Sequence, residues 1–129
     1  MKSKQGFTIL ELIIVASFAG LLLALFFVQK SNFDAFNRDE DRKTAINAMY
    51  YALEESFHKE HGYYPETISE KNLTVIDPAL WTDPDGYNLG DSKSSYSYQP
   101  ADCKNGKCKK YTLKANLEKE DTYIKTNRN

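Results

Sequence analysis

The two cysteines of this chain are among the few residues whose type and spacing could support chemistry. Cys103 and Cys108 flank the dipeptide Asn105-Gly106. Asn-Gly is the strongest short signal for a two-residue β-hairpin, so this turn sets the two cysteines opposite each other. Such a non-hydrogen-bonded pair has Cα atoms about 4.5 Å apart, within disulfide range. We predict a Cys103–Cys108 disulfide, with two free thiols as the alternative.

An oxygen-rich stretch follows Trp81 and offers ligands for a hard cation. Its candidate calcium ligands are Asp83, Asp85, Asn88 and Asp91. The stretch does not match an EF-hand loop, whose glycine sits elsewhere, and a turn region rich in Pro, Gly and Asp explains the same residues. We therefore expect no metal and no other cofactor, with calcium bound by this stretch as the alternative.

Other reactive arrangements are missing from the sequence. His58 and His61 could supply two metal ligands, but no third ligand is evident nearby and the zinc-protease spacing is absent. We find no nucleophile–base pair, phosphate-binding loop or paired carboxylates. We therefore expect no enzymatic activity.

Lysines gather around the predicted hairpin at positions that could contact an anionic surface: Lys104, Lys107, Lys109 and Lys110. They could touch DNA phosphates or a cell surface, although lysines that protect a sheet edge explain them equally well. The whole chain carries 17 Lys and Arg against 18 Asp and Glu. A net charge of -1 argues against nucleic-acid binding driven by charge alone.

The most unusual carboxylate lies in the N-terminal apolar segment. Between Phe7 and Val28, 18 of 22 residues are apolar, and Glu11 is the single charge. A helix of this length runs about 33 Å, enough to cross a hydrocarbon core of about 30 Å. A carboxylate costs about 2.5–3.5 kcal/mol at the centre of such a helix, so it needs a partner. A signal peptide cut before Gly20 is the alternative, but eight more apolar residues follow the small-residue site Ser17-Phe18-Ala19.

The string KSKQGFTILELI, from Lys2 to Ile13, closely resembles the start of type IV prepilins and of the pseudopilins of type II secretion. The resemblance implies that residues 1–6 are a leader, which a membrane prepilin peptidase removes after Gly6. It also implies that Phe7 is then methylated, and that Glu11 guides assembly as the fifth residue of the mature chain. One departure is Val28, where many pilins carry a proline that kinks the helix.

The chemistry of this motif can also be argued from the residues alone. Cleavage after Gly6 creates an α-amino group on Phe7, and since the pKa of such a group in a free peptide is about 7.7–8.0, it is mostly cationic. This amine lies one helical turn from Glu11 on the same helix face. The carboxylate can pair with its own amine or with the amine of a neighbouring subunit, and snorkelling to the membrane interface is the alternative.

The elements that position these residues begin with a long helix. Residues 7–28 form the membrane or fibre part, and residues 29–61 continue as an amphipathic helix. An apolar stripe recurs at helical spacing: Ile46, Met49, Leu53 and Phe57. Asp39 and Lys43 form an acid-before-base pair that supports the helix, and Gly62 and Pro65 stop it.

Residues 62–129 form the globular region, with a loop region and a C-terminal antiparallel sheet. With Asn105-Gly106 as the turn, the register pairs Tyr96 with Ala115, Tyr98 with Leu113, Pro100 with Tyr111 and Asp102 with Lys109. A third strand is expected near Thr122–Thr126. The Tyr–Leu–Ala face should pack on the helical stripe, which gives an α+β, pilin-like fold.

From the resemblance we expect a structural subunit of a type IV pilus that serves adhesion, twitching motility or DNA uptake. It would lie as a single-pass precursor in the cytoplasmic membrane with its N-terminus inside, and then become extracellular in the filament. Its partners would be other pilin copies, prepilin peptidase, the assembly machinery, membrane lipid and, in addition, DNA or a cell surface. The alternatives are a pseudopilin of a secretion system or a membrane-tethered binding domain that does not polymerise.

Overall fold

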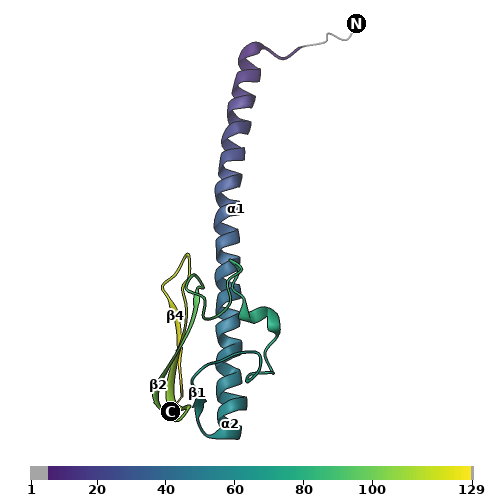
Figure 1. The fold of residues 1–129 in the computed structure, drawn as a ribbon. Helices are drawn as coiled ribbons and strands as arrows, with labels where there is room; N and C mark the ends of the chain where they lie inside the picture. The colour runs from purple at the N-terminus through teal and green to yellow at the C-terminus, as the bar shows by residue number, and fades with distance from the viewer. Residues whose placement is uncertain (1–5, 129) are drawn as a thin grey trace. The chain divides into compact units, whose positions relative to one another are not determined.

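The computed structural model (Figure 1) describes residues 6–128. The chain divides into two compact units, Met1–Asp34 and Ala35–Asn129. Residues 1–5 of the predicted leader lie outside the described residues. Helix α1, Ile9–Tyr51, contributes to both units, and we describe each unit by itself.

The first unit is an apolar helix whose described side chains are all exposed to solvent. The helix begins after Thr8, whose Oγ1 accepts a hydrogen bond from the backbone N–H of Glu11 at 3.3 Å. This is the usual capping contact between an N-cap hydroxyl and the N–H three residues later. The helix runs through Gly20 and Val28 without a break. By length and composition it can cross a membrane, as the sequence predicted.

In the second unit, the helical segment ends where the sequence predicted. After α1 it continues as the π-helical turn η1, Ala52–Phe57, and as α2, His58–His61. Gly62 follows with a left-handed backbone, φ 74°, and its N–H bonds to the carbonyl of His58. Glycine adopts this conformation without steric cost, which explains why the helix stops there.

The sheet of the second unit contains four antiparallel strands, β1 (Tyr64–Pro65), β2 (Tyr96–Lys104), β3 (Lys107–Ala115) and β4 (Tyr123–Thr126) (Figure 1). β3 is central: β2 pairs along one side, and β1 and β4 pair with its two ends on the other. The third predicted strand is thereby confirmed, and the α+β class with it. The short strand β1 was not predicted.

The register of the hairpin is confirmed pair by pair, with one exception. Tyr96 faces Ala115 and Cys103 faces Cys108, and Asn105 and Gly106 have φ of 51° and 77°, as a type I′ turn requires. Asp102 and Lys109 keep the predicted register, since the pairs on either side do, but they do not pair in the ladder. Asp102 has a left-handed backbone, φ 54°, which takes it out of the ladder, and its carboxylate pairs with Lys110 at 3.0 Å.

The core forms between one face of the sheet and the predicted helical stripe. Ile46, Met49 and Leu53 are fully buried against Tyr111 and Leu113, and Phe57 packs at the margin. The segment between β1 and β2 adds apolar residues that the sequence did not single out: Ile68, Leu73, Ile76 and, in the short 3-10 helix η2 (Pro78–Trp81), Trp81. The core therefore positions both the hairpin and the loop that precedes β2.

The π-helical turn brings a carboxylate into this core. Within this turn Ala52, Leu53 and Glu54 are consecutive and all buried. Glu54 accepts hydrogen bonds from the hydroxyls of Tyr64 at 3.1 Å and Tyr111 at 2.8 Å. Burial, and then the neighbouring Glu54, raise the pKa of Tyr64 to about 12, so this hydroxyl stays a donor at neutral pH.

We expect Tyr111→Phe to lower the free energy of unfolding of the full chain in detergent by about 2 kcal/mol, because a buried carboxylate loses a hydrogen bond. Tyr123→Phe is the matched control, since its hydroxyl bonds to the neutral amide of Asn47 at 3.0 Å. That substitution should cost about 1 kcal/mol or less. Denaturant titrations measure both, and equal losses would contradict the role assigned to Glu54.

Candidate functional site

The N-terminal candidate site consists of the residues before the first helical turn and the carboxylate within it. Gly6, Phe7, Thr8 and Glu11 line one shallow surface hollow. Among the described residues, and apart from its chain neighbour, no heavy atom lies within 4 Å of the position that a Cβ on Gly6 would take, and Phe7 is 79% exposed. The predicted cleavage position is therefore accessible to another protein in this structure.

The position of Glu11 has two physical consequences. Its carboxylate is on the first turn of α1, where the N-terminal end of the helix dipole favours a negative charge. The backbone N–H of Glu11 donates to the Thr8 hydroxyl, so the capping contact at the start of the helix does not involve the Glu11 carboxylate. Phe7 precedes the helix, which begins at Ile9 and not at Phe7 as predicted, and it lines the same hollow as Glu11. The predicted placement of its amine one helical turn from Glu11 on the same helix face therefore stays a prediction for the cleaved chain.

The second candidate site is the disulfide-closed hairpin. Cys103 and Cys108 are bonded to each other, with Cα atoms 3.9 Å apart, and the predicted disulfide is confirmed. Cys108 is fully buried in the core, whereas Cys103 is exposed. The bond therefore anchors the exposed end of β2 to the buried strand β3 next to the turn.

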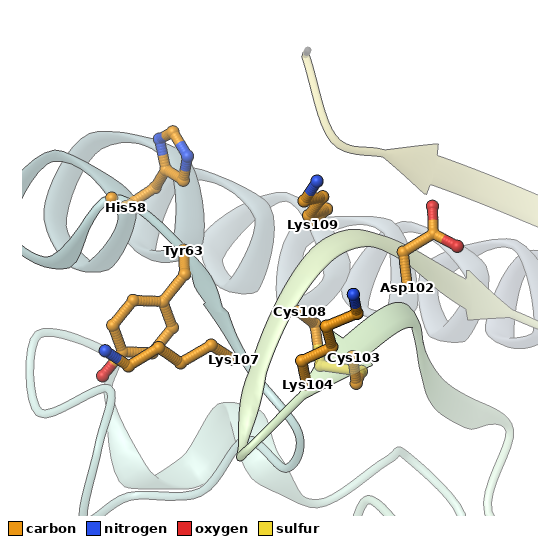
Figure 2. A pocket seen from close by; sticks show the side chains of 9 residues that line it. His58, Tyr63, Asp102, Cys103, Lys104, Lys107, Cys108 and Lys109 are labelled. Atoms are coloured by element: carbon orange, nitrogen blue, oxygen red, sulfur yellow. A yellow bond between two sulfur atoms is a disulfide. The ribbon is translucent and has the colours of Figure 1, made fainter.

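Three of the four predicted surface lysines share a cavity beside this disulfide. Lys104, Lys107 and Lys109 line a space of about 660 Å³ together with His58 and Tyr63. Figure 2 shows Lys107 alongside Tyr63, and its ammonium nitrogen lies 5.0 Å from the ring centroid, a cation–π contact. Lys110 does not line the cavity and pairs instead with Asp102. The cavity is thus basic and partly aromatic, and the Cys103–Cys108 disulfide forms part of its wall.

The predicted calcium ligands each have protein partners. Asp83 is buried and accepts hydrogen bonds from the N–H groups of Asp85, Tyr87 and Ser95 and from the Ser95 hydroxyl. The carboxylate of Asp85 pairs with Arg42 at 2.7 Å. The remaining two candidates also bond within the chain: Asn88 accepts from Thr82, and Asp91 from the Asn88 N–H. The described residues contain no group of three or more His, Cys, Asp or Glu that could hold a metal ion, and calcium binding stays an untested alternative.

The most connected charged cluster was not predicted. Arg42 is almost fully buried, and its guanidinium binds Asp39 at 2.8 Å, Glu118 at 2.8 Å and Asp85 at 2.7 Å. Glu118 also receives two hydrogen bonds of 2.7 Å from Arg38. These contacts join α1 to the loop before β2 and to the segment after β3.

The carboxylates of this cluster are held in their charged form. Burial alone would raise the pKa of Asp39, but hydrogen bonds from the N–H groups of Glu118 and Lys119 and from Arg42 outweigh it and lower the pKa. Hydrogen bonds from Arg38 and then Arg42 lower the pKa of Glu118 to about 2. The cluster is thus a charged clasp at neutral pH.

Sequence reasoning missed the clasp because its partners are distant along the chain. The expected pair of Asp39 with Lys43 is wrong: Asp39 binds Arg42, and Lys43 binds Glu40 and Glu120. The available signal was an arginine on the core side of the amphipathic helix, at the position of Arg42. A buried arginine requires carboxylate partners, and the sequence alone does not identify them.

Comparison with known proteins adds no identification, since no family model and no solved structure matches the chain.

The clasp predicts a loss of stability in acid. Since the pKa of Glu118 is near 4.5 in the unfolded chain and near 2 in the folded one, its contribution is present above about pH 4.5 and is lost as the pH falls towards 2. Between these pH values the free energy of unfolding of the wild type should fall by about 1–2 kcal/mol more than that of Glu118→Gln. This range allows for solvent screening of a partly exposed carboxylate.

The measurement is a denaturant titration of the full chain in detergent at several pH values. Glu66→Gln, which removes an exposed carboxylate that has no ion pair within the described residues, serves as the control. It should retain the acid dependence of the wild type. A Glu118→Gln variant with an unchanged acid dependence would contradict the clasp.

Proposed function

We propose that this chain is a type IV pilin, a structural subunit that is cut after Gly6, methylated on Phe7 and polymerised through its N-terminal helix. The observation that carries the proposal is Glu11. It is the single charge in a run of 22 residues that is otherwise almost entirely apolar, and every side chain of that run is exposed in the isolated chain. An apolar helix of this length needs lipid or other copies of itself around it.

The charge of Glu11 favours one position of a neighbouring helix over others. Cleavage after Gly6 leaves a mostly cationic amine on Phe7, because the pKa of a free α-amino group is about 7.7–8.0. Leaving a buried carboxylate without a partner costs about 3–5 kcal/mol, so a subunit that enters a bundle of apolar helices gains most where an amine meets Glu11. An amine on a neighbouring copy satisfies this need and fixes the stagger between the copies.

The proposed life of the chain follows from this chemistry. The precursor spans the cytoplasmic membrane once with its N-terminus inside, meets prepilin peptidase and lipid there, and passes to the assembly machinery. In the filament the second unit faces the exterior. The disulfide supports this location, because disulfides persist in oxidising compartments. The filament would serve adhesion, twitching motility or DNA uptake, without enzymatic activity of the subunit.

Two alternatives keep parts of this account. A pseudopilin of a secretion system would use the same N-terminal contacts, and the oxygen-rich stretch around Asp83 and Asp91 would then be examined first for calcium. A membrane-tethered binding domain would keep the helix as an anchor and use the basic cavity at the hairpin. It would not need a carboxylate at position 11.

Replacing Glu11 with Ala or Gln tests the proposal in cells that supply a prepilin peptidase and an assembly machinery. We expect both variants to be processed and to remain in the membrane, while their amount in sheared filaments falls at least about tenfold, since one lost charge pair is worth about 1.4 kcal/mol or more. Immunoblots of the sheared and membrane fractions measure this.

Thr8→Val is the matched control, because it removes the hydroxyl that caps the helix and leaves the carboxylate in place. This variant should assemble nearly as well as the wild type. If Thr8→Val fails as completely as Glu11→Ala, the helix start rather than the charge is responsible. A Glu11→Gln variant that assembles normally would contradict the proposed pairing, whereas a wild-type chain that never enters sheared filaments would favour the tethered domain.

A further inference from the structure

The second unit carries opposite charge at its two ends. We call Lys104, Lys107 and Lys109 the lysine tip; residues 102–110 contain four lysines and one aspartate. We call Asp41, Glu120 and Asp121 the acidic end; all three residues are exposed and adjoin the charged clasp, Asp41 on the side of the loop before β2 and the other two on the side of the segment after β3. No ion pair within residues 6–128 joins the tip to the acidic end.

The two ends are too far apart to touch within one copy. His58, which lines the tip cavity, is 17 residues after Asp41 on the same helical segment, a rise of about 25 Å. Along β3, the seven steps from Cys108 to Ala115 span about 24 Å in the same unit. Any direct contact between tip and acidic end therefore joins two copies.

The charges at both ends are available for such a contact. Lys104 and Lys109 have no carboxylate partner within the part of the chain that the structure describes, and Asp41 and Asp121 have no cationic partner there. Glu120 is paired with Lys43 and still has half of its side chain exposed. Unpaired charges on both ends favour association of copies in one orientation.

A hollow at the acidic end has the composition that a lysine side chain needs. It encloses about 220 Å³, and its walls include Ala79, Leu80 and Pro84 beside Asp41. The stem of a lysine is apolar and its ammonium needs an acceptor. Asp83 also lines the hollow, but its oxygens already accept four hydrogen bonds, so Asp41 is the lining carboxylate that remains as an acceptor.

We propose that the lysine tip of one copy docks on the acidic end of a second copy, with one lysine side chain seated in the hollow beside Asp41. The contact is head-to-tail, and a head-to-tail contact that does not close into a ring continues as an open helical array. It rests on the proposed function, because it gives the filament a second contact besides the N-terminal helix. A phosphate-bearing partner would explain the tip alone and would leave the acidic end and its hollow unused.

Carbodiimide cross-linking of assembled filaments tests the contact. The reagent activates a carboxylate, a lysine amine attacks it, and an amide forms as the urea leaves, so no spacer is added and direct contact is required. Mass spectrometry should find links between the tip lysines and Asp41, Glu120 or Asp121. The ion pairs within one copy, Lys43–Glu120 and Lys110–Asp102, are the internal positive controls.

Charge reversal provides the second test. Lys104→Glu with Lys107→Glu should reduce the tip-to-end links at least about tenfold and make sheared filaments dissociate at lower detergent concentration. Asp41→Lys with Asp121→Lys should do the same, and a chain that carries all four changes should regain both properties. Lys71→Glu, an exposed lysine outside both ends, is the matched control and should behave as the wild type.

The outcomes separate this contact from the proposed function. Filaments that show the internal control links but no tip-to-end links overturn the contact and leave polymerisation through the N-terminal helix intact. Filaments of the variant with Lys104→Glu and Lys107→Glu that resist detergent as well as wild-type filaments also overturn the contact. A wild-type chain that forms no filaments in the presence of the assembly machinery overturns the proposed function, and the contact with it.

Discussion

The constraint on which the rest of this molecule depends is an apolar helix that water cannot solvate. The side chains from Phe7 to Val28 are exposed in the isolated chain, and burying each of the large ones is worth about 1.5–3 kcal/mol. Lipid or an apolar protein surface must supply that burial. In the proposed function the single carboxylate favours other copies of the chain, since lipid offers it no partner and the amine of a neighbouring copy would.

The second unit meets the opposite requirement, because it must stay folded in water with a small core. Its sheet covers one face of the helix, the disulfide ties the hairpin beside the turn, and the clasp around Arg42 joins three segments that would otherwise be held by few contacts. Buried charges of this kind add little net stability but are costly to break, which makes them devices for fixing an arrangement. The clasp holds the acidic end in place, and the disulfide holds the lysine tip.

The parts of the fold that the sequence predicted are those governed by local rules. Asn105-Gly106 determines the turn, the turn determines the register, and the register places Cys103 against Cys108. Gly62 ends the helix for a similarly local reason. What could not be predicted depends on tertiary contacts: the π-helical turn that buries Glu54, the pairing of Arg42 with distant carboxylates, and the left-handed backbone that removes Asp102 from the ladder. The role of Glu11 rests on its chemical context in the sequence, to which the structure adds exposure and a capped helix start.

The most direct test of the account is the N-terminal residue of the protein in sheared surface filaments, determined by Edman sequencing and intact mass. We expect N-methylphenylalanine at Phe7, followed by Thr8 and Ile9. A mature chain that begins at Gly20, after the small-residue site, would have lost Glu11 and half of the apolar helix, and it would contradict the account.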